Sequence, residues 1–204
     1  MFDIAHVVFP IVVLIMSVVA HEVAHGYAAY RHGDNTALFA GRLTLNPLPH
    51  IDMFGSVILP LLALTTFGTF IGWAKPVPYN PYNLQGKFAE GWVSSAGILA
   101  NISIAIVTGI IFKILLIQGM LNETLAGGMF NIIWINISLA LFNLIPIPPF
   151  DGAGIIKAFF PRFHFNGSRF MYNPIYMIAV IIVASVLYRV IAMPLFELVR
   201  YLLS

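Results

Sequence analysis

The hydrophobic positions of this chain are gathered in long runs, and short polar segments separate them. Apolar runs cover residues 4–32, 92–117, 129–145 and 174–203. A transmembrane α-helix needs about 20 predominantly apolar residues to cross a hydrocarbon core of about 30 Å. The pattern therefore predicts an all-α polytopic membrane protein with about four full transmembrane helices.

One further apolar run, residues 53–73, does not have the pattern of a simple span. Glycines and a proline interrupt it, which favours a re-entrant or additional hydrophobic segment over a full crossing. Polar and apolar positions alternate in residues 36–52, which indicates a short β-hairpin-like element there. Residues 75–81 carry three prolines and are predicted to be extended.

The composition places this pattern in a membrane. The chain has 204 residues, of which 60% are hydrophobic and 9% charged, with a mean hydropathy of +0.92. A core of this size cannot hold so much apolar surface, so most of it must face lipid, and we expect a single membrane-embedded domain over residues 1–204. The net charge of +2 is too small to indicate a nucleic-acid partner, and the absence of cysteine excludes disulfides and thiolate metal sites. Met1-Phe2-Asp3 lacks the basic region of a cleaved signal peptide.

The distribution of basic residues predicts an orientation. The loop 118–128 carries no lysine or arginine, whereas the segments 31–91 and 146–173 carry most of the basic residues. These are Arg31, Arg42, Lys75, Lys87, Lys157, Arg162 and Arg169. By the positive-inside rule, the N-terminus and the loop 118–128 lie outside, in a multi-pass protein of the cell (plasma or inner) membrane.

A metal-binding signature lies near the end of the first apolar run. His21-Glu22-Val23-Ala24-His25 places two histidines four positions apart, so both imidazoles project from one face of a helix and can share a metal ion. Glu22 lies beside them, where it can activate a water molecule. Ionisable side chains are costly inside a membrane and are functional there by default. The predicted orientation puts this site near the cytosolic face.

A catalytic zinc site usually has three protein ligands, and the sequence offers few candidates for the third. Asp151 follows the run 129–145 in a proline-rich turn, which can direct its short carboxylate towards a neighbouring helix. If residues 53–73 re-enter the membrane, Asp151 reaches the same depth as the histidines. An Asp-Gly turn also caps helices, which is the alternative use of this residue. His50 and Asp52 are candidates for outer partners that orient an imidazole.

A second motif strengthens the interpretation. It begins at the end of the run 129–145 and reads Asn143-Leu144-Ile145-Pro146-Ile147-Pro148-Pro149-Phe150-Asp151-Gly152. With this N-x-x-P-x-x-x-x-D-G element and its H-E-x-x-H motif, the chain resembles the site-2 protease family of intramembrane zinc metalloproteases (peptidase family M50). Gly41-Arg42-Leu43-Thr44-Leu45-Asn46-Pro47 and Gly72-Trp73-Ala74-Lys75-Pro76-Val77-Pro78 resemble its small bacterial and archaeal branch, which lacks PDZ and CBS domains. The family pattern A-G-P-x-x-N reads Ala96-Gly97-Ile98-Leu99-Ala100-Asn101, with Ile98 in place of proline.

The resemblance implies a role for each motif residue. His21, His25 and Asp151 would bind one Zn²⁺ per chain, and Glu22 would be the general acid/base. Asn143 would hold the substrate backbone or polarise the scissile carbonyl. The implied substrates are transmembrane proteins cut within or near their spans, in regulated intramembrane proteolysis. The sequence also allows two other functions: a membrane zinc transporter, and a non-catalytic membrane scaffold.

Overall fold

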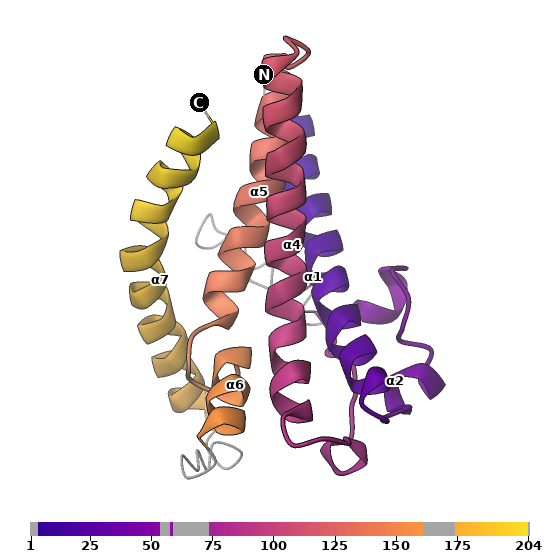
Figure 1. Cartoon of the computed structure of the whole chain (residues 1–204). Coiled ribbons are helices and arrows are strands. Elements are labelled where there is room, and N and C mark those ends of the chain that lie inside the picture. The colour runs from indigo at the N-terminus through magenta and orange to yellow at the C-terminus, as the bar shows by residue number, and fades with distance from the viewer. Residues whose placement is uncertain (1–3, 54–57, 59–73, 161–173, 204) are drawn as a thin grey trace.

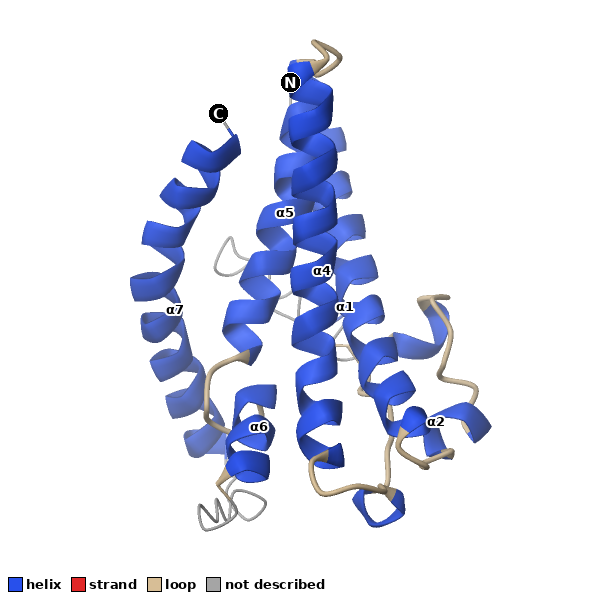
Figure 2. Cartoon of the chain, in the orientation of Figure 1, coloured by secondary structure: helices blue, strands red, loops and turns tan. Residues whose placement is uncertain are grey.

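The structure is a computed structural model, and it describes residues 4–53, 58, 74–160 and 174–203. Its described part consists of helices joined by loops and turns, and it contains no strand (Figure 2). In chain order the helices are α1 (Ile4–Arg31), α2 (Thr36–Phe39), the short 3₁₀ helices η1 (Leu48–His50) and η3 (Pro81–Asn83), α4 (Ala89–Ile117), α5 (Glu123–Asn143), α6 (Asp151–Phe159) and α7 (Pro174–Leu203).

Three helices form the centre of the molecule. The helix α4 packs against α1, α5 and α6, while α7 lies against α5 (Figure 1). Val8–Arg31 within α1, the whole of α4 and the whole of α5 are each long and apolar enough to cross a membrane. Their outer faces expose large hydrophobic side chains such as Val12 on α1 and Ile110 on α4, as expected of surfaces in contact with lipid. The all-helical membrane prediction is therefore confirmed, with three candidate spans among the described residues.

The chain leaves α1 and enters α4 at the same end of the bundle (Figure 1). The backbone N–H of Gln85, just before α4, donates to the carbonyl of His32, just after α1, at 2.7 Å. The helix α5 then returns to this end, where Lys157 of α6 pairs with Glu90 of α4 at 2.7 Å. The end of the run 129–145 thus lies at the same end of the bundle as the end of the run 4–32, as the re-entrant prediction requires. The path of residues 53–73 lies almost wholly outside the described residues.

The hairpin-like element predicted for residues 36–52 is not formed. This segment contains α2, η1 and turns. Gly41 ends α2 with a φ of +65°, a left-handed conformation that glycine adopts without strain. The Arg42 side chain then turns inward and is buried, because its Nη2 donates to the carbonyl of Lys75 at 2.7 Å. The alternation of residue types therefore does not correspond to a pleated strand: Ala37, Arg42 and His50 are buried, but they lie in short helices and a loop.

Asp34 joins the α1–α2 turn to the segment before α4. It is fully buried, and its carboxylate accepts hydrogen bonds from the hydroxyl of Thr36 (2.6 Å), the side-chain amide of Asn83 (2.8 Å) and the backbone N–H of Asn80 (2.7 Å). Burial alone would raise the pKa of Asp34, but these hydrogen bonds to the charged form outweigh it and lower the pKa below its usual value.

Candidate metal centre

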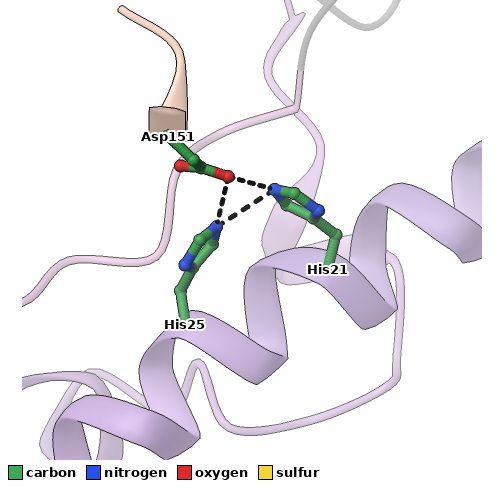
Figure 3. A group of neighbouring side chains, drawn as sticks. All are labelled: His21, His25 and Asp151. Atoms are coloured by element: carbon green, nitrogen blue, oxygen red, sulfur yellow. Dashed lines mark hydrogen bonds and ion pairs between the residues drawn. The ribbon is translucent and has the colours of Figure 1, made fainter. Parts of the chain in front are cut away.

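Two helices bring three potential metal ligands together (Figure 3). His21 and His25 project from one face of α1, one turn apart, and their Nε2 atoms are 3.0 Å apart. Asp151, the first residue of α6, directs its carboxylate at both, with Oδ2 lying 3.1 Å from His21 Nε2 and 3.2 Å from His25 Nε2. The sequence predicted these three residues, and the structure brings all three together.

Hydrogen bonds from outside the group orient both histidines so that their Nε2 lone pairs face each other and Asp151. His21 Nδ1 lies 2.6 Å from Asn101 Oδ1, and His25 Nδ1 lies 2.6 Å from the backbone carbonyl of Val93. Both partners are acceptors, so in the neutral rings each Nδ1 carries the proton and each Nε2 a lone pair. Within the described part of the chain, no hydrogen bond satisfies the buried Oδ2 of Asp151. With both rings neutral, two imidazole nitrogens and one carboxylate oxygen face one another with free lone pairs. This set of ligand atoms fits Zn²⁺.

Gly97 of α4 lies directly against the two imidazoles. A Cβ atom at this position would come within 2.5 Å of His21 Nε2, His21 Cε1 and His25 Nε2, which is far inside van der Waals contact. Glycine therefore leaves open the space beside the two Nε2 atoms. Only a residue without a side chain lets α4 approach α1 so closely without blocking the ligand atoms.

The position of Asp151 depends on the glycine that follows it. A Cβ on Gly152 would collide with the backbone carbonyl oxygens of Leu144 and Ile145, just after α5. The first turn of α6 can therefore lie against the end of α5 only with glycine at this position. The Oδ2 of Asp151 faces His21 and His25 and has no hydrogen-bond partner among the described residues, so this oxygen does not cap α6.

Glu22 is oriented by the chain before α4. Its Oε2 accepts a hydrogen bond from the backbone N–H of Val77 at 2.8 Å. Arg42 holds the two preceding residues, because its Nη2 donates to the carbonyls of Lys75 and Pro76 at 2.7 and 3.3 Å. The segment 75–77 thus fixes the carboxylate of Glu22 from outside the ligand group.

Two sequence predictions concern residues around this centre. Asn143 is the last residue of α5, and its side-chain amide donates to the carbonyl of Leu139 in its own helix at 2.9 Å. Its role towards substrate stays a prediction. His50 and Asp52 are the sequence candidates for orienting an imidazole, but the Nδ1 atoms of His21 and His25 are bonded to Asn101 and the Val93 carbonyl instead.

His50 has a different structural role. Its Nε2 bonds the carbonyl of Thr44 at 2.9 Å, and its Nδ1 faces Arg42 Nη2 at 3.4 Å.

The groups of α4 that contact the two histidines form one stripe. In the sequence, Gly97 and Asn101 belong to a family pattern that did not predict these contacts, and Val93 was not singled out. Val93, Gly97 and Asn101 are spaced four residues apart, so they share a helix face. This face meets the face of α1 that carries His21 and His25. The spacing was present in the sequence, but the orienting group of Val93 is a backbone carbonyl, which no residue type reveals.

Comparison with known proteins agrees with this geometry. The model of Peptidase family M50 matches residues 117–186, a range that includes α5, Asp151 and α6. The chain is 38% identical over 159 residues to YwhC of Bacillus subtilis (strain 168), described as a "putative zinc metalloprotease"; the match covers 74% of this chain and 68% of YwhC. No solved structure matches the chain significantly.

Two further relatives carry the same description. MJ0611 of Methanocaldococcus jannaschii is 30% identical over 157 residues, which cover 73% of each chain. Rip2 of Mycolicibacterium smegmatis is 28% identical over 150 residues, which cover 70% of this chain and 54% of Rip2. Both the family model and relatives from bacteria and an archaeon lead to one assignment. The chain belongs to peptidase family M50 and is a membrane zinc metalloprotease.

Proposed function

We propose that this protein is an intramembrane protease, which hydrolyses peptide bonds within or near the transmembrane segments of membrane proteins. One observation carries the proposal. His21 and His25 lie on a helix of membrane-crossing length, Val8–Arg31, and Asp151 of α6 meets them there. A metal site on such a helix has its reacting atoms among transmembrane segments rather than in a separate soluble domain. Substrate cleavage at this site would serve regulated intramembrane proteolysis.

Each residue has a role that follows from its chemistry. His21, His25 and Asp151 would hold one Zn²⁺, which when bound would lower the pKa of a water molecule to about 7 and polarise the peptide carbonyl. Glu22 takes a proton from the attacking water and passes it to the leaving amine as the C–N bond breaks. The Val77 N–H holds one carboxylate oxygen of Glu22 and leaves the other for this transfer. Asn143, a neutral donor, would bind the substrate backbone or stabilise the charge that develops on its carbonyl oxygen.

The placement in the membrane is part of the same proposal. We take α7, a helix of 30 residues, as a fourth full span beside α1, α4 and α5. Basic residues are concentrated in the segments 31–91 and 146–173, so the metal centre faces the cytosolic side of the cell membrane and the N-terminus lies outside. The whole chain then acts as one membrane-embedded domain, with the bilayer and transmembrane proteins as its partners.

The test separates metal binding from proton transfer. Wild type and Glu22→Gln are reconstituted in proteoliposomes with a tagged single-span substrate, and zinc content and cleavage are both measured. Glu22→Gln should keep its zinc and lose about 10²- to 10⁴-fold in cleavage rate, the contribution of a general acid/base. Glu90→Gln changes an exposed carboxylate in the Lys157 ion pair and is the matched control, with activity unchanged.

The position of the cleaved bond in the substrate tests whether the proteolysis is intramembrane. Mass spectrometry of the products should place it within the span of the substrate or at the edge of that span. Cleavage by Glu22→Gln at the wild-type rate would contradict the role of Glu22. A cut confined to the soluble part of the substrate would contradict intramembrane proteolysis.

A further inference from the structure

Three polar side chains are buried beside the metal centre in the middle of the helix bundle. Ser17 of α1, Asn101 of α4 and Asn136 of α5 are 5%, 0% and 0% exposed. Polar groups at membrane depth are costly unless hydrogen bonds satisfy them. The proposed catalytic roles use none of the three.

Their hydrogen bonds form a chain that ends on His21. Asn136 Nδ2 donates to the carbonyl of Ile132 and to Ser17 Oγ, both at 2.9 Å. Asn136 Oδ1 then accepts from Asn101 Nδ2 at 2.9 Å, and Asn101 Nδ2 also lies 3.3 Å from the carbonyl of Ser17. The free end of Asn101, its Oδ1, faces His21 Nδ1 at 2.6 Å.

The donors and acceptors along this series of hydrogen bonds can be arranged in only one way. The carbonyls of Ile132 and Ser17 accept hydrogen bonds and never donate, so each asparagine must turn its amide nitrogen towards them. This orientation presents Asn101 Oδ1 to His21, and Nδ1 of the ring must then carry the proton. The other tautomer would require Asn101 to flip, which sets its oxygen against Asn136 Oδ1 and the Ser17 carbonyl. Each buried hydrogen bond lost in this way is costly, because no water replaces it.

We propose that Ser17, Asn101 and Asn136 are positioning residues, which fix the tautomer of His21 and so present its Nε2 lone pair to the metal. His25 needs no such chain, because the Val93 carbonyl fixes its ring directly. The inference rests on the proposed role of His21 as a zinc ligand. Its test reads zinc affinity and ring protonation, so its failure is distinct from a failure of the proposed protease activity.

The first readout is the zinc dissociation constant, measured by chelator competition on purified protein. Asn101→Leu removes the acceptor and should weaken zinc binding about 10- to 100-fold, the usual cost of losing an outer partner of a metal-binding histidine. Asn101→Asp keeps an oxygen facing His21 Nδ1 but sets its other oxygen against Asn136 Oδ1 and the Ser17 carbonyl, so it should lose less zinc affinity than Asn101→Leu. Tyr188→Phe is the control, because it removes a hydrogen bond of 2.8 Å between α7 and Ser138 of α5 that does not reach His21.

The second readout is the tautomer of the His21 imidazole ring. Protein labelled with ¹⁵N-histidine is freed of metal and studied by NMR, with the His21 signals assigned from their loss in His21→Gln. Wild type and Tyr188→Phe should show the Nδ1–H tautomer alone. Asn136→Leu leaves Asn101 without its main anchor and should add a population of the Nε2–H tautomer.

Each variant can overturn the proposal. Zinc affinity of Asn101→Leu equal to wild type would show that His21 needs no acceptor. A loss in Asn101→Asp as large as in Asn101→Leu would show that packing, and not acceptance, is the function of Asn101. A single Nδ1–H tautomer in Asn136→Leu would remove Asn136 from the chain. If Asn101→Leu does not fold, Asn101→Asp and Asn136→Leu still decide the matter.

Discussion

Gly97→Ala is the substitution that probes the metal centre most closely without removing a ligand. It adds a single methyl group to the face of α4 that meets the two histidines. The new Cβ would lie 2.5 Å from atoms of both imidazoles, whereas ordinary contacts begin at 3.4 Å. One or both rings must therefore move by close to 1 Å, or α4 must move away from α1.

The cost follows from these distances. Overpacking a well-packed site by one methyl group costs about 1–3 kcal/mol, and metal–ligand distances tolerate only about 0.2 Å of error. If this cost falls on the zinc-bound arrangement, zinc affinity drops by about 5- to 150-fold, since 1.4 kcal/mol corresponds to a factor of ten.

Gly109→Ala provides the matched comparison on the same helix. A Cβ there would meet no atom within 4 Å, so it should leave zinc affinity unchanged and stabilise the helix slightly. Zinc dissociation constants and thermal unfolding midpoints of both variants in detergent give the result. Equal zinc affinity in Gly97→Ala and Gly109→Ala would refute the close approach of α4 to the histidines.

Two further predictions concern the surroundings of the centre. Gly152→Ala should lower zinc occupancy, because its Cβ collides with the Leu144 carbonyl and displaces Asp151; occupancy equal to wild type would contradict the packing of α6 on α5. Asp34→Asn should destabilise the protein at neutral pH by about 1.5–3 kcal/mol, the value of hydrogen bonds to a charged group. The lowered pKa of Asp34 gives stability that is complete above its unfolded-state pKa of about 3.9 and lost as the pH falls through the folded value. The difference in unfolding midpoint between wild type and Asp34→Asn should therefore shrink between pH 7 and pH 3; a constant difference would contradict this assignment.

The helices were predictable because their residue types are unambiguous. Lipid and a small protein core both require long apolar runs, so α1, α4, α5 and α7 lie close to the runs read from the sequence. The ligand group was predictable because His21 and His25 lie in such a run, where ionisable side chains are rare, and because the resemblance to a known family implied Asp151 as the third ligand. A re-entrant path predicted for residues 53–73 then places Asp151 and the two histidines at the same side of the membrane.

The parts that were not predicted depend on backbone atoms and on glycine. Residues 36–52 alternate like a strand, but the buried bonds of Arg42 and the left-handed Gly41 turn the chain instead. The Val93 carbonyl orients His25, and the Val77 N–H orients Glu22; neither role leaves a trace in the side chain. Such contacts arise from how helices approach one another, and a sequence pattern within one helix does not report them.

The central claim is that one zinc ion is shared between α1 and α6, with Asp151 as the ligand from the second helix. Metal analysis of purified wild type beside Asp151→Ala tests it most directly, with Glu90→Ala as a control for losing an exposed carboxylate. Wild type and Glu90→Ala should hold about one zinc per chain, whereas Asp151→Ala should hold far less because it lacks one of three protein ligands. Undiminished zinc in Asp151→Ala would contradict the split site.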